Sequence, residues 1–346
     1  MEKERLHYVD IAKGLLILMV IYGHVDGTAT ELGFSNAAID DIHKVVNIFV
    51  SFYMPCFFII TGFCSNFGKS FHSFFLSSIK TILLPAFVFS FILSGAWNIK
   101  HIENLHEFIY KIIFYGGSYW FLSALFLARI VYYVLHRWAH PLFIALFCFL
   151  SFIAGYFLSS LPQRYELWWF VHALCMLPYL GVGQILKQYW GKIDINKYYL
   201  FFIIAFIFIF FVTVVLARTE ILQKDCFFDV PGVTQGYINL NKTMLVPLVL
   251  LSVLGSLSLL GFSYKVAKNK CFEFLGRNSL VIYCVQGITL SKTMTYISRM
   301  WGTGFGVDYW TTLLLLLLSF FVAVLICALI AWVMNMKYLR IAIGKF

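Results

Sequence analysis

Charged residues are scarce in this sequence. Asp, Glu, Lys and Arg make up 12% of its 346 residues, against about 25% in soluble proteins. Hydrophobic residues make up 61% and the mean hydropathy is +0.85, so polar groups are too few to cover a water-facing surface. This composition excludes an ordinary soluble enzyme, a disordered chain and a fibrous repeat. We therefore expect an all-α, polytopic integral membrane protein.

Metal-binding and redox motifs are also lacking. The eight cysteines form no CxxC pair and the sequence has no HExxH motif, so neither a zinc site nor a redox pair is indicated. The net charge of +10 would suggest a nucleic-acid partner for a soluble protein. In a membrane protein it instead reports topology, because Lys and Arg collect on the cytoplasmic side. We expect the lipid bilayer, and no nucleic acid, as a partner.

Long apolar runs are what the sequence has instead. A membrane helix needs about 20 mostly apolar residues, and the short loops between such runs predict one membrane-embedded domain over residues 1–346. When the spans alternate across the membrane, the Lys-rich and Arg-rich loops fall on the side of both termini, which predicts cytoplasmic ends and a multi-pass protein of the cell membrane. The ten expected transmembrane helices cover roughly 8–25, 45–64, 74–97, 119–136, 141–160, 166–186, 198–217, 244–263, 272–291 and 310–334.

The first predicted span carries Asp10, Lys13 and His24. On one straight helix, Lys13 and His24 would lie about 20° apart in angle and about 16 Å apart along the axis. Asp10 and Lys13 would form an ion pair, since they are three positions apart. Polar groups inside a span are costly and are therefore functional candidates. The alternative is that the two charges snorkel to the interface and that His24 lies in a loop.

The pattern Asp10-x-x-Lys13-Gly14, followed by Gly23-His24, resembles the first-helix signature of acyltransferase family 3. Within these membrane O-acyltransferases, it is most similar to the fucose 4-O-acetylase-like branch. Lys stands at position 13 where many relatives have Arg. Four further segments resemble family motifs in the same order, at 52–63, at 80–85, at 120–125 and at 275–283. The resemblance implies about ten transmembrane helices and transfer of an acyl group.

Two positions depart from the family pattern. Tyr53 and Gln286 stand where relatives often have His. Both side chains can hydrogen-bond a substrate, but neither Gln nor an ordinary Tyr is a base at neutral pH. His24 is therefore the general base that the resemblance leaves in place, because an imidazole titrates near neutrality.

The resemblance and the chemistry of the side chains together predict the roles of other residues. His24 is the expected base, with Lys13 and Asp10 beside it as catalytic residues, and acetyl-CoA or another acyl-CoA is the donor co-substrate. Lys13, Lys80 and Arg277 are expected to contact that donor, with topological charge as the alternative for Lys80 and Arg277. No tightly bound cofactor and no metal is expected. The expected substrate contacts are Tyr53, Trp120, Asn278, Tyr283 and Gln286. The alternative for Trp120 is a place in the membrane interface, and the alternative for Asn278 and Gln286 is a contact with another helix.

The function that follows from this resemblance is O-acylation of a carbohydrate. We expect an acetyl-CoA-dependent O-acetyltransferase whose acceptor is a hydroxyl group of a cell-envelope glycan or glycan-lipid. Two alternatives stay open. One is a polytopic transporter in which Asp10, Lys13 and His24 relay protons, and the other is a non-catalytic relative.

Overall fold

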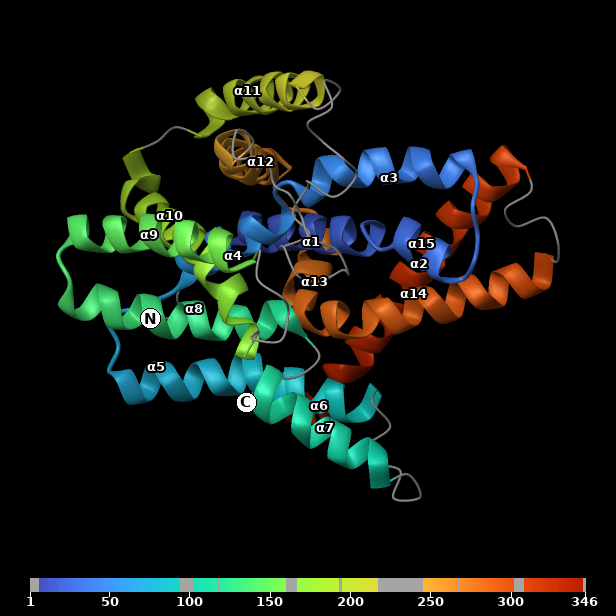
Figure 1. The fold of residues 1–346 in the computed structure, drawn as a ribbon, viewed down its shortest axis with the longest axis horizontal. Helices are drawn as coiled ribbons and strands as arrows, with labels where there is room; N and C mark the ends of the chain where they lie inside the picture. The colour runs from blue at the N-terminus through green and yellow to red at the C-terminus, as the bar shows by residue number, and fades with distance from the viewer. Residues whose placement is uncertain are drawn as a thin grey trace. The chain divides into compact units, whose positions relative to one another are not determined.

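The computed structural model describes residues 6–93, 102–116, 119–159, 167–192, 195–216, 245–266, 268–301 and 308–344. These residues form helices and the loops between them, with no strand in the described ranges (Figure 1), which confirms the all-α prediction. The chain divides into two compact units. The first unit contains the described residues of Met1–Met54, Ile195–Val214 and Pro247–Met336, and the second contains those of Pro55–Asp194, Val215–Val246 and Lys337–Phe346.

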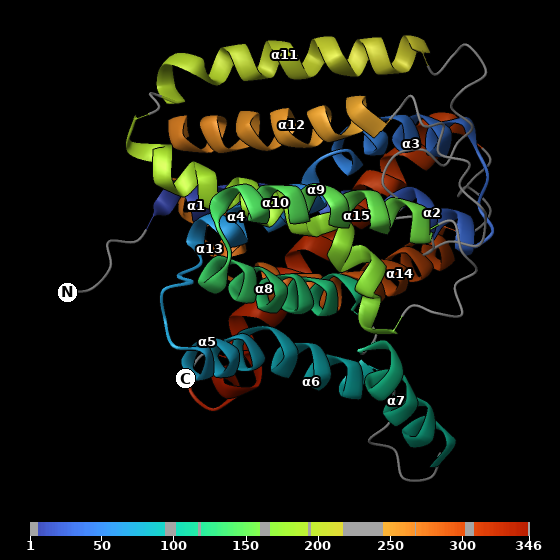
Figure 2. The same cartoon turned by 60° about the vertical axis from the view of Figure 1, so that its left-hand side comes forward.

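The first unit consists of helices from both ends of the sequence. The N-terminal α1 and α2 pack with α14 and α15, and Lys265 at the end of α12 lies over the ring of Tyr199 in α11, 5.3 Å from its centroid. Figure 2 shows α11 and α12 next to each other. Its helices are α1 (His7–Tyr22), α2 (Val25–Glu31), α3 (Ala37–Val50), α11 (Ile195–Leu216), α12 (Leu245–Lys265), α13 (Lys270–Arg277), α14 (Ser279–Trp301) and α15 (Tyr309–Met334).

The second unit consists of helices from the middle of the sequence. Its centre is α10, which packs against α8 and α9. Between α5 and α6, the five residues Ile79–Leu83 form a π-helix, a rare local winding that is frequent at functional sites. The helices are α4 (Tyr53–Cys64), α5 (Phe71–Ser78), α6 (Leu84–Leu93), α7 (Ile102–Tyr115), α8 (Trp120–Trp138), α9 (Pro141–Ser159) and α10 (Phe170–Tyr189), with a short helix at Leu339–Ile343. The first two residues of α4, Tyr53 and Met54, belong to the first unit.

Several helical stretches are long and apolar enough to cross a membrane. In such stretches the backbone N–H and C=O groups hydrogen-bond to one another within the helix, so they need no water and can lie in lipid. The count of ten spans, the side of the termini and the single domain stay predictions. Among the described residues, the stretches that meet the criteria of length and composition are His7–Glu31, Ala37–Cys64, Phe71–Leu93, Pro141–Leu158, Leu167–Tyr189 and Tyr309–Met334.

Two of the predicted span boundaries are wrong. The second span begins with α3 at Ala37 rather than near 45, because the Asn36 side chain accepts a hydrogen bond from the Ala38 N–H and caps the helix. The ninth prediction, 272–291, joins two different helices. The short α13 ends at Arg277, and α14 starts at Ser279 and continues to Trp301.

Glycine permits the close crossing of α1 and α13 in the first unit. A Cβ atom at Gly14 would overlap the backbone of Phe272, and one at Gly276 would overlap the backbone of Asp10. Small residues at such crossings let two backbones approach closely. Gly14 and Gly276 therefore allow the backbones of α1 and α13 to come into contact.

Polar side chains fix helix ends in both units. Asp308 caps α15 by accepting a hydrogen bond from the Thr311 N–H at 2.9 Å. This hydrogen bond, together with one from the Thr311 hydroxyl, lowers the pKa of the Asp308 carboxyl. In the second unit, Gln184 of α10 donates to the Gly62 carbonyl at the end of α4. These contacts satisfy backbone groups that a helix terminus leaves open.

Candidate functional site

The His24 imidazole lies at the break between α1 and α2. Helix α1 ends at Tyr22, and the His24 N–H bonds the Ile21 carbonyl at 3.2 Å, so the winding tightens into a turn. Glycine at position 23 favours such an end, because it is a poor helix former. The prediction that Lys13 and His24 share one uninterrupted helix is therefore wrong. His24 is instead the exposed residue before α2.

Asp10 takes part in a charge network between α1 and α13. The Arg277 Nε lies 3.4 Å from Asp10 Oδ2, and the same guanidinium lies 2.8 Å from Glu273 Oε2. His7 Nδ1 approaches Glu273 at 3.1 Å. The predicted ion pair of Asp10 with Lys13 is wrong, because the second helix brings a closer cation. A donor phosphate at Arg277 would have to compete with two buried carboxylates.

Lys13 is half-buried on α1. Among the residues that the structure describes, no carboxylate forms an ion pair with it. A partly buried ammonium without a counter-charge is costly. Lys13 is therefore better placed than Arg277 to receive an anionic group of a ligand.

Tyr53 comes close to the turn that carries His24. A Cβ atom at Gly23 would lie 3.5 Å from Tyr53 Cε1, which is ordinary van der Waals distance. Tyr53 begins α4 and is half-buried. The structure thus brings together two predicted site residues that the first loop separates in the sequence.

Three predicted substrate contacts lie at or on α14, which packs against α1. Asn278 is 3% exposed, donates to the Phe274 carbonyl at 2.8 Å and accepts from Asn335 at 2.7 Å. These bonds favour the helix-contact alternative for Asn278. Tyr283 is half-buried. The Gln286 side chain is 5% exposed, and its Oε1 has no hydrogen-bond partner among the described residues, so it can accept from a ligand hydroxyl.

The two remaining predicted residues belong to the second unit. Lys80 is exposed and lies in the π-helix. Trp120 is half-buried at the start of α8, and its ring centroid is 5.1 Å from that of the buried His172. One face of the Trp120 indole is therefore occupied by protein.

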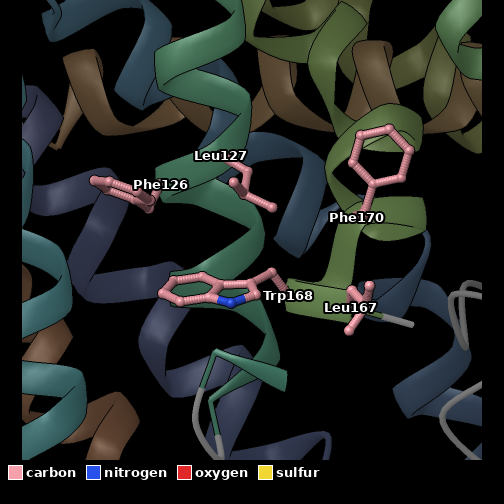
Figure 3. A pocket seen from close by; sticks show the side chains of 5 residues that line it. All are labelled: Phe126, Leu127, Leu167, Trp168 and Phe170. Carbon is pink, nitrogen blue, oxygen red and sulfur yellow. The ribbon is translucent and has the colours of Figure 1, made fainter. Parts of the chain in front are cut away.

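A pocket of about 560 Å³ opens in the second unit near the N-terminus of α10. The Trp168 indole forms one wall, and its Nε1 donates to the Ile113 carbonyl at 3.0 Å. Trp168 and Trp169 both have left-handed backbone conformations, with φ of 55° and 54°. Because the lining is apolar, the pocket suits an apolar group rather than a charged one. The lining residues, drawn in Figure 3, are Phe126, Leu127, Leu167, Trp168 and Phe170.

Sequence reasoning missed a carboxylate–imidazole pair beside His24. Asp26 of α2 is 7% exposed, and its Oδ2 lies 2.5 Å from Nδ1 of His43 on α3. The His43 side chain is 40% exposed. When His43 is neutral, the bond at Nδ1 leaves Nε2 as a hydrogen-bond acceptor. The pair was missed because residues 26–44 lie between the first two predicted spans, where a loop is expected. A predicted loop gives no helical spacing from which the distance between Asp26 and His43 follows.

The described residues of the first unit therefore provide several groups that acyl transfer needs. His24 carries an imidazole, Lys13 a cation, and Tyr53 and Gln286 polar side chains that can form hydrogen bonds. Attack of a hydroxyl on a thioester requires a proton acceptor and a positive group for the developing oxyanion.

Comparison with known proteins gives the family. The acyltransferase family 3 model, described as an Acyltransferase domain, matches residues 6–332. No curated protein matches the chain, and no solved structure does. Because the match covers nearly all of the sequence and the helices include apolar stretches of membrane-spanning length, this multi-pass membrane protein belongs to acyltransferase family 3.

Proposed function

We propose that this protein transfers an acetyl group from acetyl-CoA to a hydroxyl group of a cell-envelope carbohydrate. The observation that carries the proposal is the exposed His24 imidazole at the α1–α2 turn, in a chain whose family transfers acyl groups. An imidazole with an ordinary pKa near 6.5 is well matched to general base catalysis at neutral pH.

The proposed reaction is a direct transfer. His24 takes the proton of the acceptor hydroxyl as its oxygen attacks the thioester carbonyl carbon. The new C–O bond forms, the C–S bond breaks, and the departing thiolate of CoA takes the proton from the imidazolium. The products are the acetylated carbohydrate and CoA with a free thiol.

Lys13 and Asp10 have different supporting roles in this proposal. Lys13, which has no ion pair among the described residues, holds a phosphate of the donor or polarises the thioester carbonyl. Asp10 acts through Arg277, because its carboxylate on α1 holds the guanidinium at the end of α13. Lys80 and Arg277 are further proposed contacts of the donor.

The acceptor is proposed to contact Tyr53 and residues of α14, which belong to the first unit. Tyr53 beside the His24 turn and the unpartnered Gln286 Oε1 can hydrogen-bond hydroxyl groups of a sugar. Tyr283 is a further proposed contact, as are Trp120 and Asn278, although His172 and Asn335 already contact these two.

The test is a thiol-release assay in proteoliposomes with acetyl-CoA and candidate glycan acceptors. His24→Ala is expected to lower the acceptor-dependent rate by about 10²–10⁴-fold, the usual contribution of a general base. His72→Ala changes an exposed histidine of α5 and serves as the matched control, with an unchanged rate.

Three outcomes would contradict the proposal. Transfer at the normal rate by His24→Ala would exclude this base. Movement of a solute without thiol release would favour the transporter alternative. Binding of acetyl-CoA without turnover on any envelope glycan would favour a non-catalytic relative.

A further inference from the structure

Positive charge dominates the described part of the second unit. Its acidic residues there are Glu103 and Glu107, and both lie on α7. Glu107 already pairs with Lys111 of the same helix at 2.7 Å. The other Lys and Arg residues of this part therefore have few carboxylates available to them, and anions from outside the chain are the natural counter-charges.

Arg129 of α8 is a partly buried cation that lacks a counter-charge among the described residues. Its Cζ lies 5.0 Å from the centroid of the Phe74 ring. Its Nε is buried and has no hydrogen-bond partner among the described residues, and no ion pair joins Arg129 to a described carboxylate. Removing a guanidinium from water without a counter-charge costs free energy. An anion from outside the chain would supply the missing counter-charge.

A second basic residue is attached to the same face of α8 through its backbone. Tyr133 lies one helical turn after Arg129, and its hydroxyl donates to the Lys69 carbonyl at 2.7 Å. The Phe74 ring stacks on the Tyr133 ring at 4.7 Å between centroids. These contacts fix the backbone of Lys69 beside the rings of Phe74 and Tyr133, and its exposed side chain starts from there.

A third cation comes from α10. Lys187 donates through Nζ to the Ser65 carbonyl just after α4. Two residues after Ser65, the ring centroid of Phe67 lies 5.4 Å from that of Phe74, the ring over which Arg129 lies. The segment that follows α4 thus lies beside Arg129 of α8 and Lys187 of α10, within the second unit.

We propose that Arg129, with Lys69 and Lys187, binds a phosphate group of a ligand. Arginine presents several N–H donors in a planar fork that matches phosphate oxygens, and lysine adds charge. Two ligands carry this chemistry, a phosphate of acyl-CoA or the headgroup of an anionic lipid. The first source rests on the proposed function, while the second does not.

The test measures binding by purified protein in nanodiscs of neutral phosphatidylcholine. Coenzyme A is titrated as the soluble phosphate ligand, and phosphatidylglycerol is incorporated into the nanodisc in a separate series. Arg129→Gln is expected to weaken the binding of one of these probes by about 10–100-fold, the range for a lost hydrogen bond to a charged group. Arg137→Gln, an exposed arginine of the same helix, is the matched control and should bind within about twofold of wild type.

A measurement on the unchanged protein keeps the proposal testable if Arg129→Gln does not fold. Inorganic phosphate should raise the unfolding temperature of wild type above that in chloride at equal ionic strength, because it binds the folded state. Arg129→Lys should show a smaller rise. Equal temperatures for wild type in the two salts, or unchanged binding of both probes by Arg129→Gln, would overturn the proposal.

The outcomes separate this site from the proposed reaction. Weakened coenzyme A binding by Arg129→Gln assigns the site to the donor, and weakened phosphatidylglycerol binding assigns it to a lipid. Loss of acetyl transfer in His24→Ala with phosphate binding intact would concern the reaction alone. Phosphate binding without any acyl transfer would support the site and contradict the function.

Discussion

At the residue scale, buried polar groups are accounted for by partners that lie far away in the sequence. Asn278 was expected as a substrate contact or a helix contact, and its oxygen accepts from Asn335 of α15. Arg277 was expected to contact the donor, and it bridges Asp10 and Glu273. The sequence identifies these residues as unusual in an apolar chain. It does not identify the partner, because partner choice depends on how helices cross.

Replacing His43 by Ala should destabilise the first unit. The change leaves the Asp26 carboxylate buried without the imidazole at 2.5 Å, and an unsatisfied buried group costs about 1–3 kcal/mol. The unfolding temperature in detergent should therefore fall. Lys44→Ala is the control on the same helix, since Lys44 is exposed and pairs only with exposed Asp41 among the described residues. Identical unfolding temperatures for His43→Ala and wild type would refute the structural importance of the pair.

At the element scale, the presence of a helix was easier to predict than the places where a helix breaks or changes its winding. The apolar runs correctly indicated helices at α8, α9, α11, α12 and α15, because hydrophobic length is a strong local signal. The break at Gly23 and the π-helix at Ile79–Leu83 were missed. Both arise from a change in winding over a few residues, and packing against other helices decides whether such a change is tolerated.

Gly276→Ala should strongly disrupt the crossing of α1 and α13. The added Cβ would meet the Asp10 backbone, which cannot move like a flexible side chain, so a loss at or above the usual overpacking cost of about 1–3 kcal/mol is expected. Gly287→Ala in α14 is the matched control, because nothing lies within 4 Å of its Cβ. That change should stabilise the protein by up to about 1 kcal/mol.

Thermal unfolding of both variants in detergent checks this contrast. If the Gly276→Ala and Gly287→Ala proteins unfold at the same temperature, the backbones of α1 and α13 do not approach each other as closely as described.

At the scale of the whole molecule, ten spans predict on which side each loop lies. Lys111 on α7 should face outward and Lys192 after α10 should face the cytoplasm. Single cysteines at these positions, in a background without native cysteines, can be labelled in intact cells with a membrane-impermeant maleimide. Lys111→Cys should react before the cells are permeabilised, and Lys192→Cys only afterwards. Labelling of both from outside would require a different number of spans between them.

The α1–α13 contact also bears on how the protein is made. Gly14 meets Phe272, and Gly276 meets Asp10, so the first helix completes its packing only after most of the polypeptide has left the ribosome. At about 5–20 residues per second, the roughly 260 residues between the two glycines take some tens of seconds to synthesise. During that interval the surface of α1 around Gly14 has no α13 to pack against, so we expect α1 to be a substrate of a membrane-insertion chaperone.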